Sequence, residues 1–266
     1  MPRRLLSFRD KRVLITGASS GIGRALALDL AGRGARLGLI ARRREELEVL
    51  ATEIRDSGGE ACVAVADIAE RAETFAACAA LSEALGGIDL LINNAGYGHH
   101  RRFLDWEVED IQRMMQVNYM GAVHATKAVL PGMVERGEGF LVFIASVAGK
   151  IAPPDESAYA ASKFAMVGLA ESLSLEVEEH GIHVLTVCPG AIRTPFFDAE
   201  ALTRMPAVAK NTMVPVQGLV DAIVRGLQRG AHEITHPRFI RAGYVVRALA
   251  PSFMRTQVRR TTKRPD

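Results

Sequence analysis

The sequence predicts an α/β protein built on a doubly wound parallel β-sheet of about seven strands with helices on both faces. Short apolar and β-branched runs alternate along the chain with longer stretches of helical pattern. Parallel strands need connections of roughly a dozen residues, usually helical, and such helices cover both faces of the sheet. We expect one domain over residues 1–236 and a C-terminal extension over residues 237–266.

The first half of the chain shows this alternation three times. Strand-like runs at 12–16, 36–41 and 61–66 are each followed by a helical stretch, at 22–33, 43–57 and 70–85. Paired glycines at 58–59 and 86–87 follow the second and third of these stretches. Glycine favours the conformation that ends a helix, so the helices are expected to stop there.

The second half continues the pattern with longer helices. Strands are expected at 89–92, 139–145, 182–187 and 233–235, and helices at 108–136, 158–180 and 214–228. The chain shows no internal repeat and no linker before about residue 236. The sequence therefore predicts one continuous sheet followed by the extension.

Composition is that of an ordinary globular protein. Of 266 residues, 48% are hydrophobic and 24% charged. The three cysteines are odd in number and widely spaced, which predicts neither a disulfide framework nor a metal site and fits a reducing compartment. Without a signal sequence or an apolar run long enough to span a membrane, we expect a cytoplasmic protein.

Charge is distributed unevenly along the chain. Residues 237–266 contain eight Lys or Arg and one Asp, a net charge of +7, so the +3 of the whole chain leaves −4 for the rest. An acidic body argues against a nucleic-acid partner. The extension has apolar residues at helical spacing, interrupted at Pro251. A basic amphipathic segment can bind an anionic membrane surface, pack on its own domain or pack on a second subunit.

A glycine-rich loop follows the first expected strand. Residues Gly17, Gly21 and Gly23 lie between this strand and the first helix. Glycines let the backbone approach a pyrophosphate closely, and the helix N-terminus offers free N–H groups to the anion. In this βαβ context the loop predicts a dinucleotide site.

The loop reads Thr-Gly-x-x-x-Gly-x-Gly from Thr16, and here the chain resembles the short-chain dehydrogenase/reductase family. The resemblance covers about residues 8–235 and implies a Rossmann-type fold, a nicotinamide cofactor and a homodimer or homotetramer paired through the long helices. The further cofactor contacts that it implies are Ser19, Ser20, Ile22, Asp67, Ile68, Asn94, Ala95, Gly96, Pro189, Gly190, Ile192 and Thr194. Asn93 could tie neighbouring strands together.

The end of the second expected strand indicates which nicotinamide cofactor binds. An acidic residue there would bind the adenosine ribose hydroxyls and repel a 2′-phosphate. This strand ends in Ala41, and Arg42, Arg43 and Arg44 follow. Because guanidinium groups suit a phosphate dianion, the sequence predicts NADP(H), with Arg42 as the main contact and Ser19 as a helper.

Tyr159 and Lys163 form the expected catalytic pair. Their spacing places them one turn apart on the same face of a helix. An ammonium group beside the phenol, together with the charge of an oxidised nicotinamide, is expected to favour the phenolate. Ser146 ends the fifth strand and could hold the substrate oxygen. By resemblance Asn118 completes a catalytic tetrad, and Lys163 also binds the nicotinamide ribose.

The substrate site is expected between the sixth strand and the next helix, over roughly residues 195–213. That segment is rich in flexible apolar side chains, which indicates a hydrophobic substrate: Phe196, Phe197, Leu202, Met205, Val208 and Met213. The loop at 99–102, which carries two histidines and two arginines, either edges the same cleft or is simply solvated.

Three functions agree with these features. The first is NADP(H)-dependent reduction of a hydrophobic ketone or aldehyde, and the second is oxidation of a sterol-like or aliphatic alcohol at the same site. The third is a non-catalytic cofactor-binding scaffold, against which the complete tetrad argues. A preference for NADP(H) favours reduction. The sequence does not identify the physiological substrate.

Overall fold

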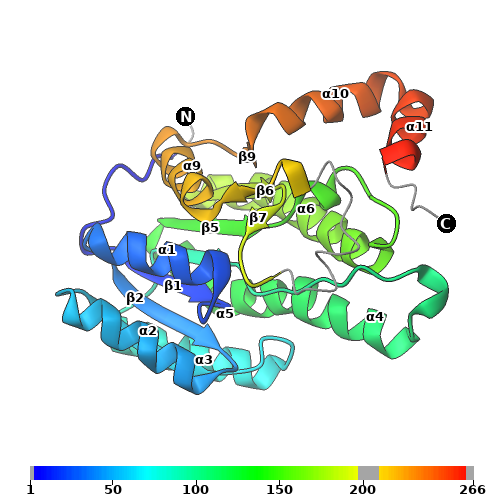
Figure 1. Cartoon of the computed structure of the whole chain (residues 1–266). Coiled ribbons are helices and arrows are strands. Elements are labelled where there is room, and N and C mark those ends of the chain that lie inside the picture. Colours follow the sequence, from blue (N-terminus) through cyan, green and yellow to red (C-terminus); the bar gives the residue numbers. More distant parts are fainter. Residues whose placement is uncertain (1–2, 197–209, 262–266) are drawn as a thin grey trace.

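Seven parallel strands form one sheet in the structure, a computed structural model that describes residues 3–196 and 210–261 (Figure 1). Their order across the sheet is β3-β2-β1-β4-β5-β6-β9, which confirms the doubly wound α/β fold. The strands are β1 (Arg12–Thr16), β2 (Arg36–Ala41), β3 (Glu60–Val65), β4 (Leu90–Asn93), β5 (Gly139–Ile144), β6 (Ile182–Pro189) and β9 (Glu233–His236).

Helices cover both faces of this sheet. One face carries α1 (Gly21–Gly32), α2 (Arg44–Asp56) and α9 (Val216–Arg229), and the other carries α3 (Arg71–Leu85), α5 (Gly121–Arg136) and α6 (Ser157–Val177). Alternate residues of β1 enter the two cores: Val13 and Ile15 pack on the first face and Leu14 on the second. This alternation follows from the two-residue period of a strand.

The long helical region expected over residues 108–136 is confirmed, but it is not a regular α-helix throughout. It consists of α4 (Val108–Met115), a π-helical turn at Gln116–Met120 and α5, which contains Pro131. A π turn inserts one extra residue into the helical hydrogen-bond pattern, and such turns occur frequently at functional sites. Here the turn places the side chain of Asn118 inside the protein.

Two other expected helices have different ends. The helix expected over 158–180 is regular only to Val177 and closes with a 3₁₀ turn at Glu178–His180. The helix expected from residue 214 begins at Val216, because β8 (Val214–Pro215) pairs with β7 (Ile192–Arg193) in a small second sheet. This pairing of two-residue strands has no periodicity that a sequence pattern could reveal.

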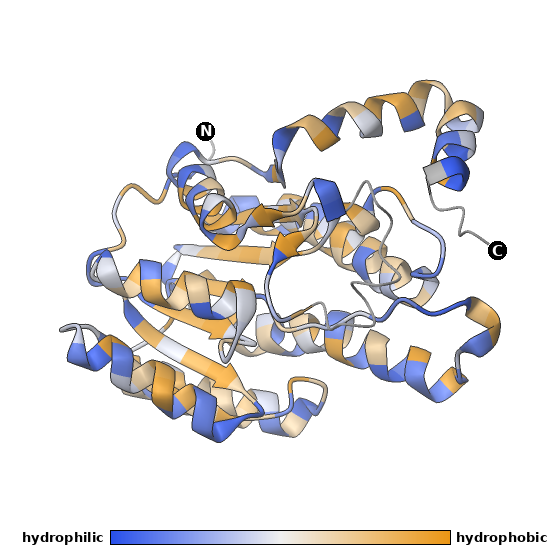
Figure 2. Cartoon of the chain, in the orientation of Figure 1, coloured by the Kyte–Doolittle hydropathy of each residue, from blue (hydrophilic) through white to orange (hydrophobic). Residues whose placement is uncertain are grey.

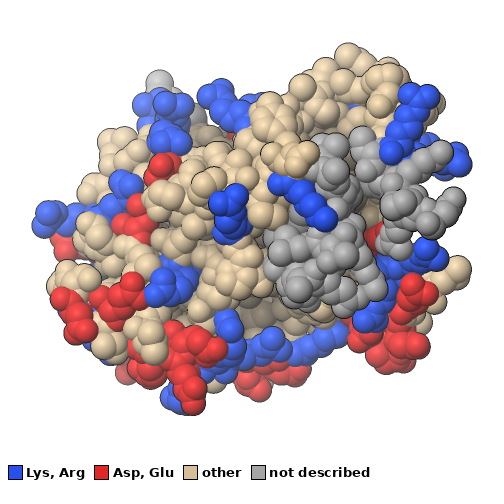
Figure 3. Space-filling model, viewed as in Figure 1, with Lys and Arg blue, Asp and Glu red and all other residues tan. Residues whose placement is uncertain are grey.

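Beyond β9 the chain forms an arm of two helices, α10 (Arg241–Leu249) and α11 (Pro251–Thr261). Pro251 separates them, as the sequence predicts. Hydrophobic residues run along α10 (Figure 2), and Lys and Arg side chains gather at the α11 end of the arm (Figure 3). No helix among the described residues is both long and apolar enough to cross a membrane.

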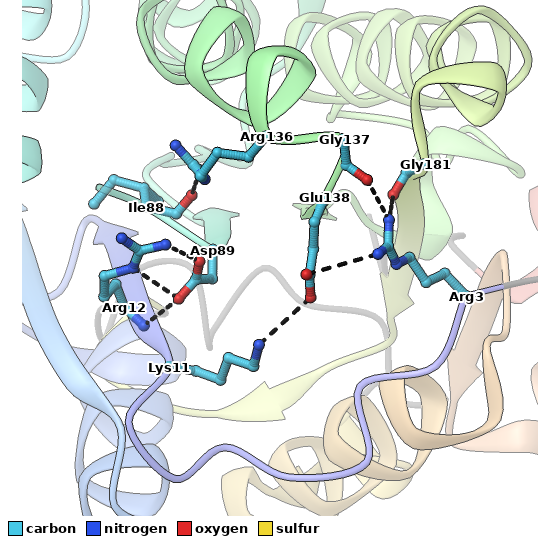
Figure 4. Close-up of polar contacts among 9 residues, drawn as sticks. All are labelled: Arg3, Lys11, Arg12, Ile88, Asp89, Arg136, Gly137, Glu138 and Gly181. Atoms are coloured by element: carbon cyan, nitrogen blue, oxygen red, sulfur yellow. Dashed lines mark hydrogen bonds and ion pairs between the residues drawn. The ribbon is translucent and has the colours of Figure 1, made fainter. Parts of the chain in front are cut away.

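Charged side chains hold the edge where the strands begin (Figure 4). Arg12 donates from its Nε to Oδ2 of Asp89 at 2.9 Å, and its backbone N–H donates to the same oxygen at 3.0 Å. Arg3 donates to the carbonyl oxygens of Gly137 and Gly181. These contacts tie the amino-terminal segment to the loops before β4, β5 and β6, leaving the opposite edge for a site.

Candidate active site

A cleft of about 670 Å³ lies at the carboxyl ends of the strands. It is lined by the segments that follow β1, β2, β3, β4, β5 and β6, where the strand order reverses between β1 and β4. Ligands of open parallel sheets bind at such a crevice. Of the expected catalytic and cofactor-binding residues, all but Gly23 and Asn118 line this cleft, and Met213 of the expected substrate segment does not.

The glycine loop leaves no room for side chains. Gly17 and Gly21 have φ values of +66° and +57°, which L side chains rarely adopt. A Cβ at Gly23 would lie 2.4 Å from the carbonyl oxygen of Gly17 and 2.5 Å from Nδ2 of Asn94. Gly23 therefore packs the loop against β4 instead of touching the cleft. The loop ends where α1 begins, so free backbone N–H groups face the cleft.

The two amide side chains of the Asn-Asn-Ala-Gly segment, residues 93–96, form different hydrogen bonds. Asn94 Nδ2 donates to the carbonyl oxygens of Thr16 and Gly17 at 3.0 and 3.1 Å, tying β4 to the glycine loop. Asn93 instead donates to Thr126 of α5 at 3.0 Å, and its Oδ1 is buried without a partner. The strand-tying role that the sequence suggested for Asn93 therefore belongs to Asn94.

The end of β2 carries arginines that point into the cleft region. Arg43 Nη2 donates to Ser19 Oγ at 2.9 Å, and Arg42 Nη1 lies 3.9 Å from a carboxylate oxygen of Asp67. Both arginine side chains are more than half exposed. Arg113 of α4, which the sequence did not indicate, also binds Asp67. The carboxylate of Asp67 therefore has two cations beside it, while Arg43 also pairs with Glu46 and Arg113 with Glu70.

Tyr159 and Ser146 meet across the cleft. Both side chains line the cleft, and Ser146 Oγ accepts from the Ala148 N–H at 3.0 Å. Burial raises the pKa of Tyr159 most, the hydroxyl of Ser146 lowers it, and the carboxylate of Glu156 raises it by a smaller amount. The lowering expected from Lys163 and an oxidised nicotinamide is not found in the protein alone, where burial is the largest influence and Lys163 is not among the groups that shift the pKa.

Lys163 lies one turn beyond Tyr159 on α6 and is buried. Its Nζ donates to the carbonyl oxygen of Ile144 at 2.9 Å and lies 5.7 Å from the centre of the Tyr159 ring. Burial lowers the pKa of Lys163 to about 8. The ammonium uses one proton on Ile144, so two remain for other acceptors in the cleft.

Asn118 supports this arrangement from behind. Its Oδ1 accepts from the Tyr97 N–H at 2.9 Å, and its Nδ2 donates to the Tyr97 carbonyl at 2.8 Å and to Ser162 Oγ at 3.0 Å. The side chain therefore holds the segment after β4 against α6.

The loop at 99–102 after β4, for which the sequence allowed either a place at the cleft or a solvated one, contributes two histidines to the cleft. His99 and His100 both line the cleft, whereas Arg101 turns away to Asp110. His100 Nδ1 lies 2.9 Å from Oε1 of Glu156, which the sequence analysis missed. Glu156 is the N-cap residue of α6, and a carboxylate three residues before the expected catalytic tyrosine is the signal that could have identified it.

Apolar side chains line the rest of the cleft. They come from separate segments: Val117, Val147, Ile151, Phe196 and Ile240. The ring of Phe196 lies 5.9 Å from that of Tyr159. Of the other apolar residues expected in the substrate segment, Phe197, Leu202, Met205 and Val208 lie outside the described residues.

Known proteins share these features. The family model for short chain dehydrogenases matches residues 11–204. The chain belongs to the short-chain dehydrogenase/reductase family. Members of this family bind NAD or NADP, and the chain is an oxidoreductase of this type.

Relatives in the short-chain dehydrogenase/reductase family come from distant organisms. Oxidoreductase UcpA of Salmonella typhimurium is 39% identical over 223 residues, which cover 81% of this chain and 84% of the relative. Dehydrogenase/reductase SDR family member 7B of Bos taurus is 40% identical over 192 residues, which cover 70% of this chain and 59% of the relative. A gluconate 5-dehydrogenase from Burkholderia cenocepacia, solved with NADP and tartrate, matches 89% of this chain and 97% of its own at 30% identity, with a TM-score of 0.79.

Proposed function

We propose that this protein is an NADP(H)-dependent reductase of a carbonyl carbon in a hydrophobic substrate, with Tyr159 as the proton donor. The observation that carries this proposal is that Ser146, Tyr159 and Lys163 line one cleft together with the glycine loop. A bound nicotinamide would supply the hydride, and the cradle of glycines and helix N-terminus fits its pyrophosphate.

The four expected catalytic residues have different roles in the proposed proton transfer. Ser146 Oγ accepts from the Ala148 N–H, which fixes the hydroxyl in the cleft, and its proton would turn to the carbonyl oxygen of a bound substrate. Tyr159 then gives its proton to that oxygen as negative charge develops there. Lys163 places positive charge beside the phenol and has protons left for ribose hydroxyls. Asn118 acts through the backbone of Tyr97 and through Ser162.

NADP(H) is favoured over NAD(H) by the groups at the end of β2. Arg42, Arg43 and Ser19 line the cleft there, and no acidic residue takes the position of Ala41. The Burkholderia cenocepacia neighbour was solved with NADP, which supports the same choice. The check is the ratio of kcat/KM for NADPH and NADH, which we expect to exceed tenfold. A preference for NADH would overturn this assignment.

Reduction is favoured over oxidation by the arginines that line the cleft after β2, because the preference for NADP(H) that they support is the one associated with reduction. With its pKa raised by burial, the phenol of Tyr159 carries near neutral pH the proton that reduction consumes. The oxidation of a sterol-like or aliphatic alcohol is the same reaction reversed and remains the second function. Initial rates in both directions near neutral pH distinguish them, with the reductive rate expected to be the larger.

The assignment of Tyr159 is tested by Tyr159→Phe. The variant should lose turnover by at least about a thousandfold, the range for removing a general acid, while NADPH still binds with a Kd within about threefold of the wild type. Screening a panel of apolar ketones and aldehydes for NADPH oxidation would identify the substrate class. A Tyr159→Phe enzyme with substantial residual activity would refute the role of the phenol.

A homodimer or homotetramer is also proposed. The long helices α5 and α6 lie on the same face of the sheet and leave Val134 and Leu175 exposed. Leu175 is 74% exposed, and a second copy of these helices would cover it. Light scattering of the purified protein should give a multiple of 28.8 kDa, and Leu175→Glu should shift it toward the monomer.

A further inference from the structure

The arm formed by α10 and α11 has one side packed on the protein and one side open. On the packed side, Arg247 lies over the ring of Phe164 of α6 at 5.2 Å, and Tyr244 meets Thr235 of β9 at 3.5 Å between hydroxyl oxygens. These contacts fix the arm to the sheet and to α6. Packing on the chain's own domain therefore accounts for one side of the arm only.

The open side carries a row of apolar side chains. Phe239, Val245, Leu249 and Phe253 are 62%, 58%, 81% and 56% exposed, and Ala242 is exposed among them. Ala242, Val245 and Leu249 follow one another at three and four residues and so share one side of α10, a helix along which Figure 2 shows hydrophobic residues. Phe239 lies in the turn before α10, and Phe253 lies beyond Pro251 on α11. We call these five residues the outer stripe. Single exposed apolar residues are common, but a row along one helix marks an interaction surface.

Positive charge surrounds the outer stripe. Between Glu233 and Asp266 the sequence contains no acidic residue, so the arm has no anion of its own. Within the described part of the chain, Arg238, Arg241 and Arg255 form no ion pair and are exposed. Arg259 and Arg260 add two further cations on α11, where Figure 3 shows the basic groups together.

We propose that the arm docks on an anionic lipid surface, with the outer stripe in the interfacial layer and the arginines at the headgroup phosphates. An amphipathic helix that combines an apolar side with Lys and Arg binds membranes in this manner, lying in the plane of the surface. A second protein copy fits less well, because five side chains cannot cover the roughly 800 Å² per partner of a stable interface.

The position of the arm gives this docking a consequence for substrate access. Ile240, which precedes α10, lines the cleft and packs against Gly190, while its neighbour Phe239 is exposed. A lipid surface held by the outer stripe therefore lies beside the wall of the cleft. Resting on the proposed function, this geometry indicates that the apolar carbonyl substrate enters from the lipid phase.

Sedimentation of the full-length protein with sucrose-loaded vesicles tests the docking. Vesicles of phosphatidylcholine alone are compared with vesicles in which about a third of the lipid is phosphatidylglycerol. We expect binding to the anionic vesicles at low salt and weak binding to the neutral ones. Each replacement of Arg241, Arg255 or Arg259 by Gln should lower the partition coefficient roughly fivefold. Absence of sedimentation with anionic vesicles would overturn the inference.

Two variants test whether vesicle binding depends on the outer stripe or on any exposed apolar residue. Val245→Asp with Leu249→Asp should reduce the partition coefficient at least tenfold. Val49→Asp, at a residue of α2 that is 63% exposed, should leave it unchanged. Equal binding by the first variant and the wild type would refute the role of the stripe. A change in oligomeric mass in that variant would instead identify a second copy as the occupant and overturn the proposal.

The lipid-docking proposal and the reductase proposal can be refuted independently of each other. Vesicle binding is measured without cofactor or substrate, so it does not depend on the reductase activity. NADPH oxidation with a water-soluble ketone should be the same in the Val245→Asp, Leu249→Asp variant and the wild type, because neither residue lines the cleft. Normal activity without vesicle binding overturns the docking alone. Vesicle binding without activity overturns the reductase proposal and leaves the docking in place.

Discussion

Asn118 Nδ2 donates a hydrogen bond to Ser162 Oγ at 3.0 Å, which joins the π-helical turn to the helix that carries Tyr159 and Lys163. Ser162 in turn donates to the carbonyl oxygen of Tyr159 at 2.7 Å. Both Asn118 and Ser162 are fully buried. The side chain of Asn118 therefore influences the position of Tyr159 through a chain of two hydrogen bonds, without lining the cleft.

Removing the hydroxyl of Ser162, which links the two hydrogen bonds, should lower kcat more than it changes KM for NADPH. In Ser162→Ala the Nδ2 of Asn118 loses one buried acceptor, which costs about 1–3 kcal/mol of stability. Because the carbonyl of Tyr159 loses its hydroxyl partner, we expect kcat to fall by about tenfold with KM for NADPH little changed. Urea unfolding and steady-state kinetics check the two effects. Ser162→Thr, which keeps the hydroxyl, should recover part of kcat if it is accommodated.

Glu156 should set the pH dependence of the phenol. Its negative charge disfavours the phenolate and so raises the pKa of Tyr159, by less than burial raises it and by less than the Ser146 hydroxyl lowers it. Replacing Glu156 by Gln removes that charge, so the pKa of Tyr159 should fall. The rising limb of kcat/KM against pH for alcohol oxidation, which needs the phenolate, should therefore move to lower pH.

A neighbouring acid provides the control for Glu156. Asp155→Asn removes a carboxylate that does not influence the pKa of Tyr159, so its profile should match the wild type. Glu156→Gln also breaks the contact with His100, and His100→Gln breaks the same contact while keeping the carboxylate. A Glu156→Gln profile that is unmoved, or moved to higher pH, contradicts the assignment.

Much of this site could be predicted because it depends on local rules. The spacing of Tyr159 and Lys163 on one helix, and the ends of β1, β4 and β5, follow from periodicity alone, and all of these residues line one cleft. Family resemblance supplied Asn118, but its bonds to Tyr97 and Ser162 could not be predicted. They depend on the π turn, for which the run Gln116–Met120 has no recognised signature.

The direction of the pKa shift of Tyr159 is another property that the sequence could not predict. The sequence places Lys163 one turn away, and pairwise reasoning then predicts a lowered pKa. The direction is set instead by how much of the phenol the tertiary structure encloses, and burial prevails. The pairing of His100 with Glu156 also joins two segments more than fifty residues apart in the sequence, so no local pattern indicates it.

The arginines after β2 should decide the choice of cofactor. Arg42→Ala and Arg43→Ala each remove one exposed guanidinium from the cleft, and a hydrogen bond to a charged group contributes about 1.5–3 kcal/mol. We expect KM for NADPH to rise by about tenfold or more in each variant, with KM for NADH nearly unchanged. Arg44→Ala is the matched control, because Arg44 does not line the cleft. Equal losses with both cofactors would assign these arginines a structural role.

The stability of the fold should depend on Asp89 in a pH-dependent manner. Partial burial alone would raise the pKa of Asp89, but the hydrogen bonds and charge of Arg12 outweigh it, and the pKa lies below its ordinary value. A carboxyl whose pKa is lowered by folding stabilises the protein above its unfolded pKa of about 3.9. That stabilisation disappears as the pH falls through the folded pKa.

Asp89→Asn should therefore destabilise the protein by about 2 kcal/mol at pH 7, because Arg12 loses its charged partner in a site that is only partly accessible. Urea unfolding measured at pH 7 and again below pH 4 checks this, and the difference between variant and wild type should shrink at the lower pH. Asp56→Asn, at an exposed carboxylate at the end of α2, should unfold like the wild type at both pH values. A difference for Asp89→Asn that is constant with pH would mean that packing, and not the charge of the carboxylate, joins β1 to β4 at this edge.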